Sequence, residues 1–91
     1  MRQIDFVVLS TISQLNAKRQ EANNVTIRSH VANVMEKDVS FTAISISLSE
    51  LKREGYIEEI KDPSRLQWRV TDAGRVMLRK ETTSITAMAL A

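Results

Sequence analysis

The stretch SFTAISISLSELKREG, from Ser40 to Gly55, decides how the rest of the chain is interpreted. Ile44, Leu48 and Leu51 recur at positions i, i+4 and i+7, a spacing that puts them on one apolar stripe of a helix. Ser40 suits the N-cap, because its hydroxyl can accept a hydrogen bond from a free backbone N–H of the first turn. Gly55 suits the residue after the helix, where the backbone often adopts a positive φ. The stretch therefore predicts an amphipathic helix between these two residues.

The other side of that helix, over residues 41–54, carries short and mostly uncharged side chains. At about 100° per residue, this side presents Thr42, Ser45, Ile46, Ser49 and Arg53. A helix face that only meets solvent would carry more Lys and Glu. Small hydrogen-bonding side chains would instead allow the helix to enter a groove and touch the edges of bases.

Length and composition limit the class of protein. The chain has 91 residues, enough for one small domain, and its 43% hydrophobic and 26% charged residues are typical of a globular protein. It contains no cysteine, which excludes disulfides and thiolate metal sites. No apolar run is long enough to span a membrane and the start does not resemble a signal peptide, so we expect a cytoplasmic protein without a membrane partner. The net charge of +2 is only a weak indication of a polyanionic partner.

Hydrophobic spacing predicts three further helices, over about residues 5–19, 27–37 and 72–80. Lys18 and Arg19 are expected in the last turn of the first helix, where cations suit the helix dipole. Thr26 and Thr71 are the expected N-caps of the other two. The short connection between the helices at 27–37 and 41–54 matches a helix-turn-helix, with Val39 buried between them.

The hydrophobic period changes after Gly55. Leu66, Trp68 and Val70 alternate with polar residues, as in a half-buried strand. Strands at 56–60 and 66–70 about a polar turn at 61–65 predict a β-hairpin, and the irregular alternation of the first strand predicts a bulge. Val25 is expected to pair with this hairpin as a very short strand. Gly74, in the first turn of the last helix, predicts close packing there.

These elements predict a mainly α fold with a small β-hairpin (α+β), in the order α-β-α-α-β-β-α. Residues 1–81 are expected to form one domain. The tail at 82–91 is either a frayed terminus or a dimerisation element, since Ile85, Met88 and Leu90 would otherwise face water.

Enzymatic chemistry is not expected. The single histidine, His30, has no neighbouring set of ligands, and the chain contains no nucleophile elbow and no glycine-rich phosphate loop. With two glycines and so small a core, a buried substrate cavity is hard to accommodate. We therefore predict no catalytic residue, metal, cofactor or small-molecule ligand.

Two sequence segments carry a resemblance to a known family. They are LSELKREGYI, from Leu48 to Ile57, and WRVTDAGR, from Trp68 to Arg75, and Val25 and Thr26 before the second helix add to them. The first segment has the order leucine, charged residues, Gly, an aromatic residue and Ile, and the second contains VTxxGR. This pattern resembles the winged helix-turn-helix transcriptional regulators of prokaryotes, such as the MarR and PadR families. The resemblance covers about residues 5–80.

The resemblance implies a sequence-reading, duplex-DNA-binding protein, a small transcriptional regulator of a bacterium or phage that acts as a homodimer. The helix 41–54 would enter the major groove, and the hairpin 56–70, the wing, would lie on the backbone or in the minor groove. The residues implied to face DNA are Thr42, Ser45, Ile46, Ser49 and Arg53 on the helix, Lys61, Arg65 and Arg69 on the wing, and Thr26 and Arg28 at the start of the second helix.

Two other functions remain open. Winged helices also serve as protein–protein interaction modules, and the low net charge together with the hydroxyl-rich, only mildly basic helix favours that alternative. A replication or partition protein that binds DNA repeats is the other.

Overall fold

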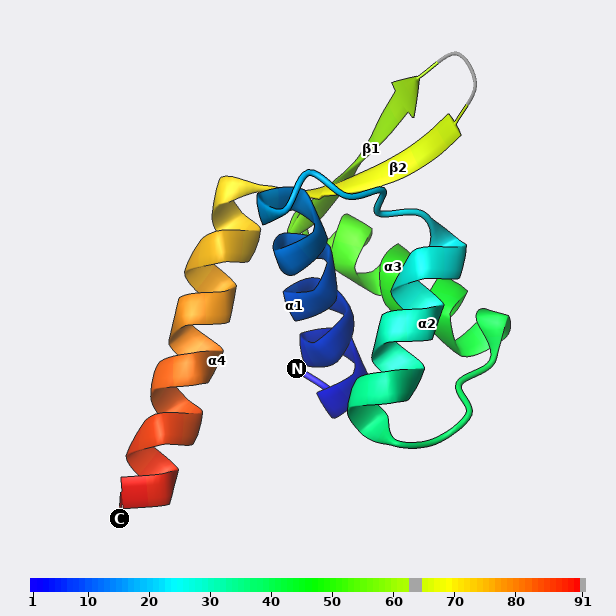
Figure 1. Cartoon of the computed structure of the whole chain (residues 1–91). Helices are drawn as coiled ribbons and strands as arrows, with labels where there is room; N and C mark the ends of the chain where they lie inside the picture. Colours follow the sequence, from blue (N-terminus) through cyan, green and yellow to red (C-terminus); the bar gives the residue numbers. More distant parts are fainter. Residues whose placement is uncertain (63–64, 91) are drawn as a thin grey trace.

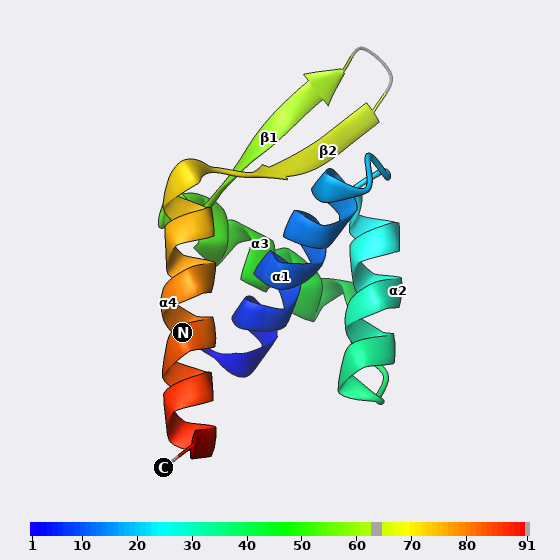
Figure 2. The same cartoon turned by 60° about the vertical axis from the view of Figure 1, so that its left-hand side comes forward.

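Three helices pack into a body, a hairpin projects from one end of it, and a fourth helix runs beside the first (Figures 1 and 2). The computed structural model describes residues 1–62 and 65–90, with side chains described except at residues 62, 65 and 84–90. The elements are α1 (Gln3–Ala17), α2 (Asn24–Met35), α3 (Phe41–Arg53), β1 (Ile57–Asp62), β2 (Arg65–Val70) and α4 (Asp72–Leu90). The mainly α class with a β-hairpin is confirmed, but the order is α-α-α-β-β-α, without the short strand expected at Val25.

The predicted caps of α3 are confirmed. The Ser40 hydroxyl accepts a hydrogen bond from the Ala43 backbone N–H at 3.1 Å. Gly55 has a φ of +80°, and nothing lies within 4 Å of a Cβ built on it. Both ends of α3 therefore follow from local sequence.

The start of α2 differs from the prediction, because Asn23 caps the helix instead of Thr26. The Asn23 side chain accepts a hydrogen bond from the Thr26 backbone N–H at 2.9 Å, and the Thr26 hydroxyl accepts one from the Asn23 backbone N–H at 3.1 Å. This reciprocal pair is a capping box, which brings Val25 into the first turn, 64% exposed. In place of the expected pairing of Val25, the Trp68 N–H donates to the Ala22 carbonyl at 2.9 Å.

α1 begins and ends two residues before the predicted bounds. Lys18 and Arg19 follow the helix rather than lying in its last turn, so that prediction was wrong. Arg19 has a φ of 56°, and the Gln20 backbone N–H donates to the Leu15 carbonyl at 2.9 Å, which closes the helix end.

The hairpin is a regular antiparallel ladder from the pair Ile57↔Val70 to the pair Asp62↔Arg65. The predicted bulge is therefore wrong, and the strands extend into the predicted turn until only residues 63–64 separate them. A physical reason is the cross-strand pair Glu58↔Arg69, whose opposite charges favour this register.

The core lies where α1, α2 and α3 meet the base of the hairpin. It contains Val8, Leu9 and Ile12 of α1, Ile27 and Val31 of α2, Ile44, Leu48 and Leu51 of α3, Val39 of the turn, and Ile57, Trp68 and Val70 of the hairpin. The burial of Val39 confirms the prediction for the turn.

The start of α4 is packed against the base of the hairpin. The Thr71 hydroxyl accepts from the Gly74 N–H at 3.1 Å, as predicted for an N-cap. A Cβ on Gly74 would lie 2.2 Å from the Tyr56 carbonyl oxygen, which confirms the close packing expected there. The helix continues to Leu90, past the end expected near residue 80, and its last turns extend beyond the body (Figures 1 and 2). Within the described ranges, no helix is long and apolar enough to cross a membrane.

Candidate nucleic-acid interface

The outer face of α3 is an exposed strip of short side chains. Thr42, Ser45, Ile46, Ser49 and Arg53 are all exposed on it. Ile44, Leu48 and Leu51 on the inner face are buried in the core. The structure thus brings five of the predicted site residues together on one face, and we call them the α3 strip.

A buried polar contact holds α3 on α1. The Ser47 hydroxyl, fully buried, donates to the Asp5 carboxylate at 2.7 Å, and Arg2 donates to the same carboxylate twice at 3.0 Å. Burial alone would raise the pKa of Asp5, but the hydrogen bonds from Arg2 and Ser47 outweigh it and hold the pKa below its usual value. Ser47 is a positioning residue that sequence reasoning missed. The sequence feature that could have indicated this role is a single hydroxyl residue next to the apolar stripe of α3.

The N-terminal end of α3 carries a second feature that sequence reasoning missed. Phe41 is 48% exposed, and the Arg28 guanidinium lies 4.6 Å from the centre of its ring, a cation–π contact. The Arg28 Nε also donates to the Val39 carbonyl at 2.7 Å. Arg28, a predicted phosphate contact, is therefore engaged in tying α2 to the turn before α3.

The predicted wing residues differ in their surroundings. Lys61 is exposed on β1. The Arg69 guanidinium forms an ion pair with Glu58 on the opposite strand, with its Nε 2.8 Å from the carboxylate. The side chain of Arg65 lies outside the described residues.

Two other predicted site residues also have partners within the protein. Arg53 forms an ion pair with Glu50, one turn before it on α3. The Thr26 hydroxyl takes part in the capping box of α2 and donates to the Glu21 carbonyl at 2.7 Å. These bonds show that Thr26 stabilises the start of α2.

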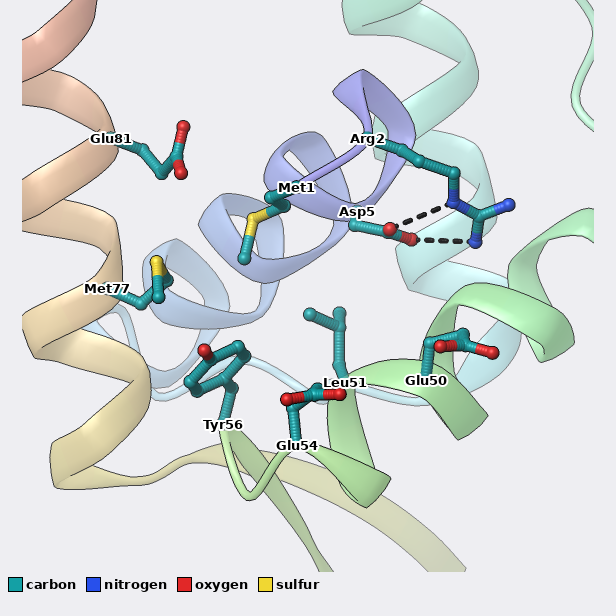
Figure 3. A pocket seen from close by; sticks show the side chains of 9 residues that line it. All are labelled: Met1, Arg2, Asp5, Glu50, Leu51, Glu54, Tyr56, Met77 and Glu81. Carbon is teal, nitrogen blue, oxygen red and sulfur yellow. Dashed lines mark hydrogen bonds and ion pairs between the residues drawn. The ribbon is translucent and has the colours of Figure 1, made fainter.

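Two acidic residues near the end of α3, Glu50 and Glu54, line a surface pocket, and Glu50 also pairs with Arg53 of the α3 strip. Figure 3 shows Glu50 and Glu54 beside a surface pocket of about 480 Å³, between α3, the start of α1 and α4. The other lining residues are Met1, Arg2, Asp5, Leu51, Tyr56, Met77 and Glu81. This pocket was not foreseen from the sequence. At about 100° per residue, Glu50 lies about 40° around α3 from Ile46, so it borders the α3 strip instead of lying between its hydroxyl groups.

The electrostatics of the wing base are locally balanced. Lys52 at the end of α3 donates to Glu59 on β1 at 2.9 Å, and this hydrogen bond holds the pKa of Glu59 below its usual value.

Among the residues whose placement is described, no group of His, Asp and Glu side chains is arranged to hold a metal ion.

Comparison with known proteins identifies the fold. No protein-family model matches the sequence, and no curated protein matches it either. The complex structure of hsRosR-S4 is similar at a TM-score of 0.79 and 11% identity, over 97% of this chain and 73% of that one. Streptococcus pneumoniae FabT in complex with DNA is similar at a TM-score of 0.65 and 21% identity, over 98% of this chain and 57% of that one. A PadR family transcription regulator from Clostridium difficile is similar at a TM-score of 0.71 and 11% identity, over 97% of this chain and 92% of that one.

A MarR family transcription regulator is also similar, at a TM-score of 0.75 and 16% identity, over 99% of this chain and 56% of that one. These likenesses agree with the arrangement of α2, α3 and the β1–β2 hairpin. They confirm the resemblance to MarR and PadR regulators at the level of the fold. The chain has a winged helix-turn-helix fold like that of these transcription regulators.

Proposed function

We propose that this protein is a small DNA-binding transcriptional regulator that places α3 in the major groove and the β1–β2 wing on the backbone or in the minor groove. The observation that carries the proposal is the α3 strip, an exposed face without long side chains before Arg53 on a helix whose other face is anchored in the core. Similar folds belong to transcription regulators, and FabT was solved in complex with DNA. No catalytic role is proposed.

The roles of the site residues follow from their chemistry. Hydroxyls of Thr42, Ser45 and Ser49 would donate to and accept from bases or phosphates, which positions the helix more than it selects sequence. The wing residues Lys61, Arg65 and Arg69 would contact phosphates, as would Thr26 and Arg28 near the N-terminus of α2. Arg53 and Arg69 would exchange their carboxylate partners for phosphates on binding.

A homodimer is part of the proposal. Residues 1–81 would form the DNA-binding unit, and 82–91 would act as a dimerisation element. In support, α4 runs past the body with Val76 53% exposed. Two copies would present two α3 helices to half-sites about one helical turn apart. Such a regulator would work in the cytoplasm.

Protein–protein interaction is the second candidate function. It is favoured by the ion pairs that already neutralise Arg53 and Arg69 and by the small net charge of +2. A surface of this kind has less positive potential than most DNA-binding faces.

Selection of bound duplexes from a random pool, followed by sequencing, tests the proposal. An enriched inverted repeat is the expected result, and its absence with folded protein would leave the interaction module as the function. Ser45→Glu puts a negative charge on the α3 strip and should abolish enrichment. Gln14→Glu adds the same charge at an exposed position of α1, about 180° around that helix from Asp5, which contacts α3, and should preserve enrichment.

A further inference from the structure

An exposed apolar side chain lies on each side of the hydroxyl groups of the α3 strip. Phe41, at the start of α3, is 48% exposed, and Ile46 is 50% exposed. At about 100° per residue they lie about 140° apart around the helix, and Thr42, Ser45 and Ser49 fall between them. The other exposed large apolar residues of the described helices, Val25, Val34 and Val76, lie on α2 and α4.

We infer that this surface selects DNA by the 5-methyl groups of thymine, with Ile46 and Phe41 as the discriminating residues and the hydroxyls between them as uniform contacts. The inference rests on the proposed DNA-binding function. It specifies which DNA the protein would prefer. The preferred duplexes would have thymines at the positions that Ile46 and Phe41 contact.

The chemistry of the strip leaves few other means of base discrimination. Asn, Gln, Lys and Arg form the bidentate contacts that distinguish adenine and guanine in the major groove. The strip has none of these except Arg53, which lies at the far end of α3 and is paired with Glu50. A hydroxyl both donates and accepts, so it can bond to any of the four base pairs. The thymine methyl is the apolar group that the major groove offers, and two exposed apolar side chains match it.

Both apolar side chains are held in place. Arg28 stacks on the Phe41 ring while its Nε is bonded to the Val39 carbonyl, which fixes the ring at the N-terminal edge. Ile46 is β-branched, so a helix leaves it one strongly preferred rotamer. Little side-chain entropy is then lost when either residue contacts a base, which favours binding.

The test compares two versions of one duplex. A duplex recovered from the random pool is prepared with thymine and with dU, which lacks only the 5-methyl group. The protein should bind the dU duplex about fourfold more weakly for each methyl contacted, the affinity equivalent of one buried methylene-sized group. Ile46→Ala should weaken binding to the thymine duplex and leave binding to the dU duplex nearly unchanged, so the ratio of the two affinities falls.

Val34→Ala is the matched control, since it shortens an exposed aliphatic side chain on α2 and should keep the full ratio. Ile46 is half exposed, so its variant is expected to fold, and its circular dichroism spectrum checks this. Equal affinity of the native protein for thymine and dU duplexes would overturn the inference while DNA binding stands. Failure to enrich any duplex would overturn both the inference and the proposed function.

Discussion

α3 and the hairpin are adjacent on the proposed DNA-binding side, but they are stabilised by opposite means. α3 is held by buried apolar side chains and one buried hydroxyl–carboxylate bond, and before Arg53 its outer face carries no charge. On the hairpin, Arg69 is paired with Glu58, and Glu59 with Lys52 at the end of α3. In the proposed function, α3 would therefore contribute a rigid, shaped surface, and the wing would contribute charge that is redirected toward phosphates.

The largest expected effect lies on the inner face of α3. Leu48 is 2% exposed in the core, so Leu48→Ala should lower the free energy of unfolding by about 2–5 kcal/mol. Ser49→Ala, one residue along on the outer face, should change it by less than about 0.5 kcal/mol. Urea unfolding followed by circular dichroism measures both. Similar losses for the two variants would contradict the division of α3 into an anchored and a free face.

The junction between the wing and α4 should be nearly as sensitive. In Gly74→Ala the new methyl would meet the Tyr56 carbonyl oxygen at 2.2 Å, so the backbone must shift, at a cost of about 1–3 kcal/mol. Gly55→Ala has open space but a φ of +80°, and strain of about 1 kcal/mol is expected. Thermal unfolding compares the two. A Gly74→Ala protein as stable as the native one would show that the junction is loosely packed.

The bond between α1 and α3 makes stability depend on pH. Because the pKa of Asp5 is lower in the folded protein than in the unfolded chain, its stabilising effect is fully present above the unfolded value of about 3.9. That effect is lost as the pH falls through the folded pKa. Asp5→Asn should therefore lower stability near neutral pH and flatten its dependence below about pH 4, as urea midpoints across that range would report.

Glu59 also has a lowered pKa and contributes to the same acid range, so the difference between the native and Asp5→Asn curves isolates Asp5. Ser47→Ala removes the buried donor and should cost about 1–3 kcal/mol near neutral pH. A native and an Asp5→Asn curve that run parallel would mean that this carboxylate does not couple folding to pH.

The smallest effect on stability belongs to the wing. Lys61→Ala should leave the unfolding free energy within about 0.5 kcal/mol of the native value, because the side chain is exposed. It should weaken DNA binding on all sequences alike and reduce the slope of log affinity against log salt by about 0.9. Titrations at several salt concentrations measure that slope. An unchanged slope would remove Lys61 from the proposed phosphate contacts.

Much of the fold could be predicted because its signals are local. The stripe of Ile44, Leu48 and Leu51 and the caps at Ser40 and Gly55 involve residues within one or two helical turns, and they place α3 to within one residue. The α3 strip follows from the same period, since exposing one face of a helix is the counterpart of burying the other. The hairpin could be predicted from alternation, although its exact length could not.

The misplaced start of α2 shows where local signals compete. Asn23 and Thr26 are both good caps, and the reciprocal bonds between them decide in favour of Asn23. Docking of this segment on β2 adds to that choice, because the Trp68 N–H bonds to the Ala22 carbonyl and the Trp68 indole to the Asn24 side chain at 3.0 Å. These contacts with β2 are more than 40 residues away in sequence, so the residues around Val25 do not reveal them.

The sequence by itself determined that the chain forms an amphipathic α3 with a hydroxyl-rich outer face, followed by a hairpin. These features depend on side-chain period and on caps a few residues away. Only the tertiary structure decided that Asp5 meets Ser47, that Arg28 stacks on Phe41, and that Glu50 and Glu54 line a pocket with residues of α1 and α4. These contacts join separate elements. They form only when packing of the apolar faces has set the relative orientation of those elements, because the two partners are far apart in the sequence.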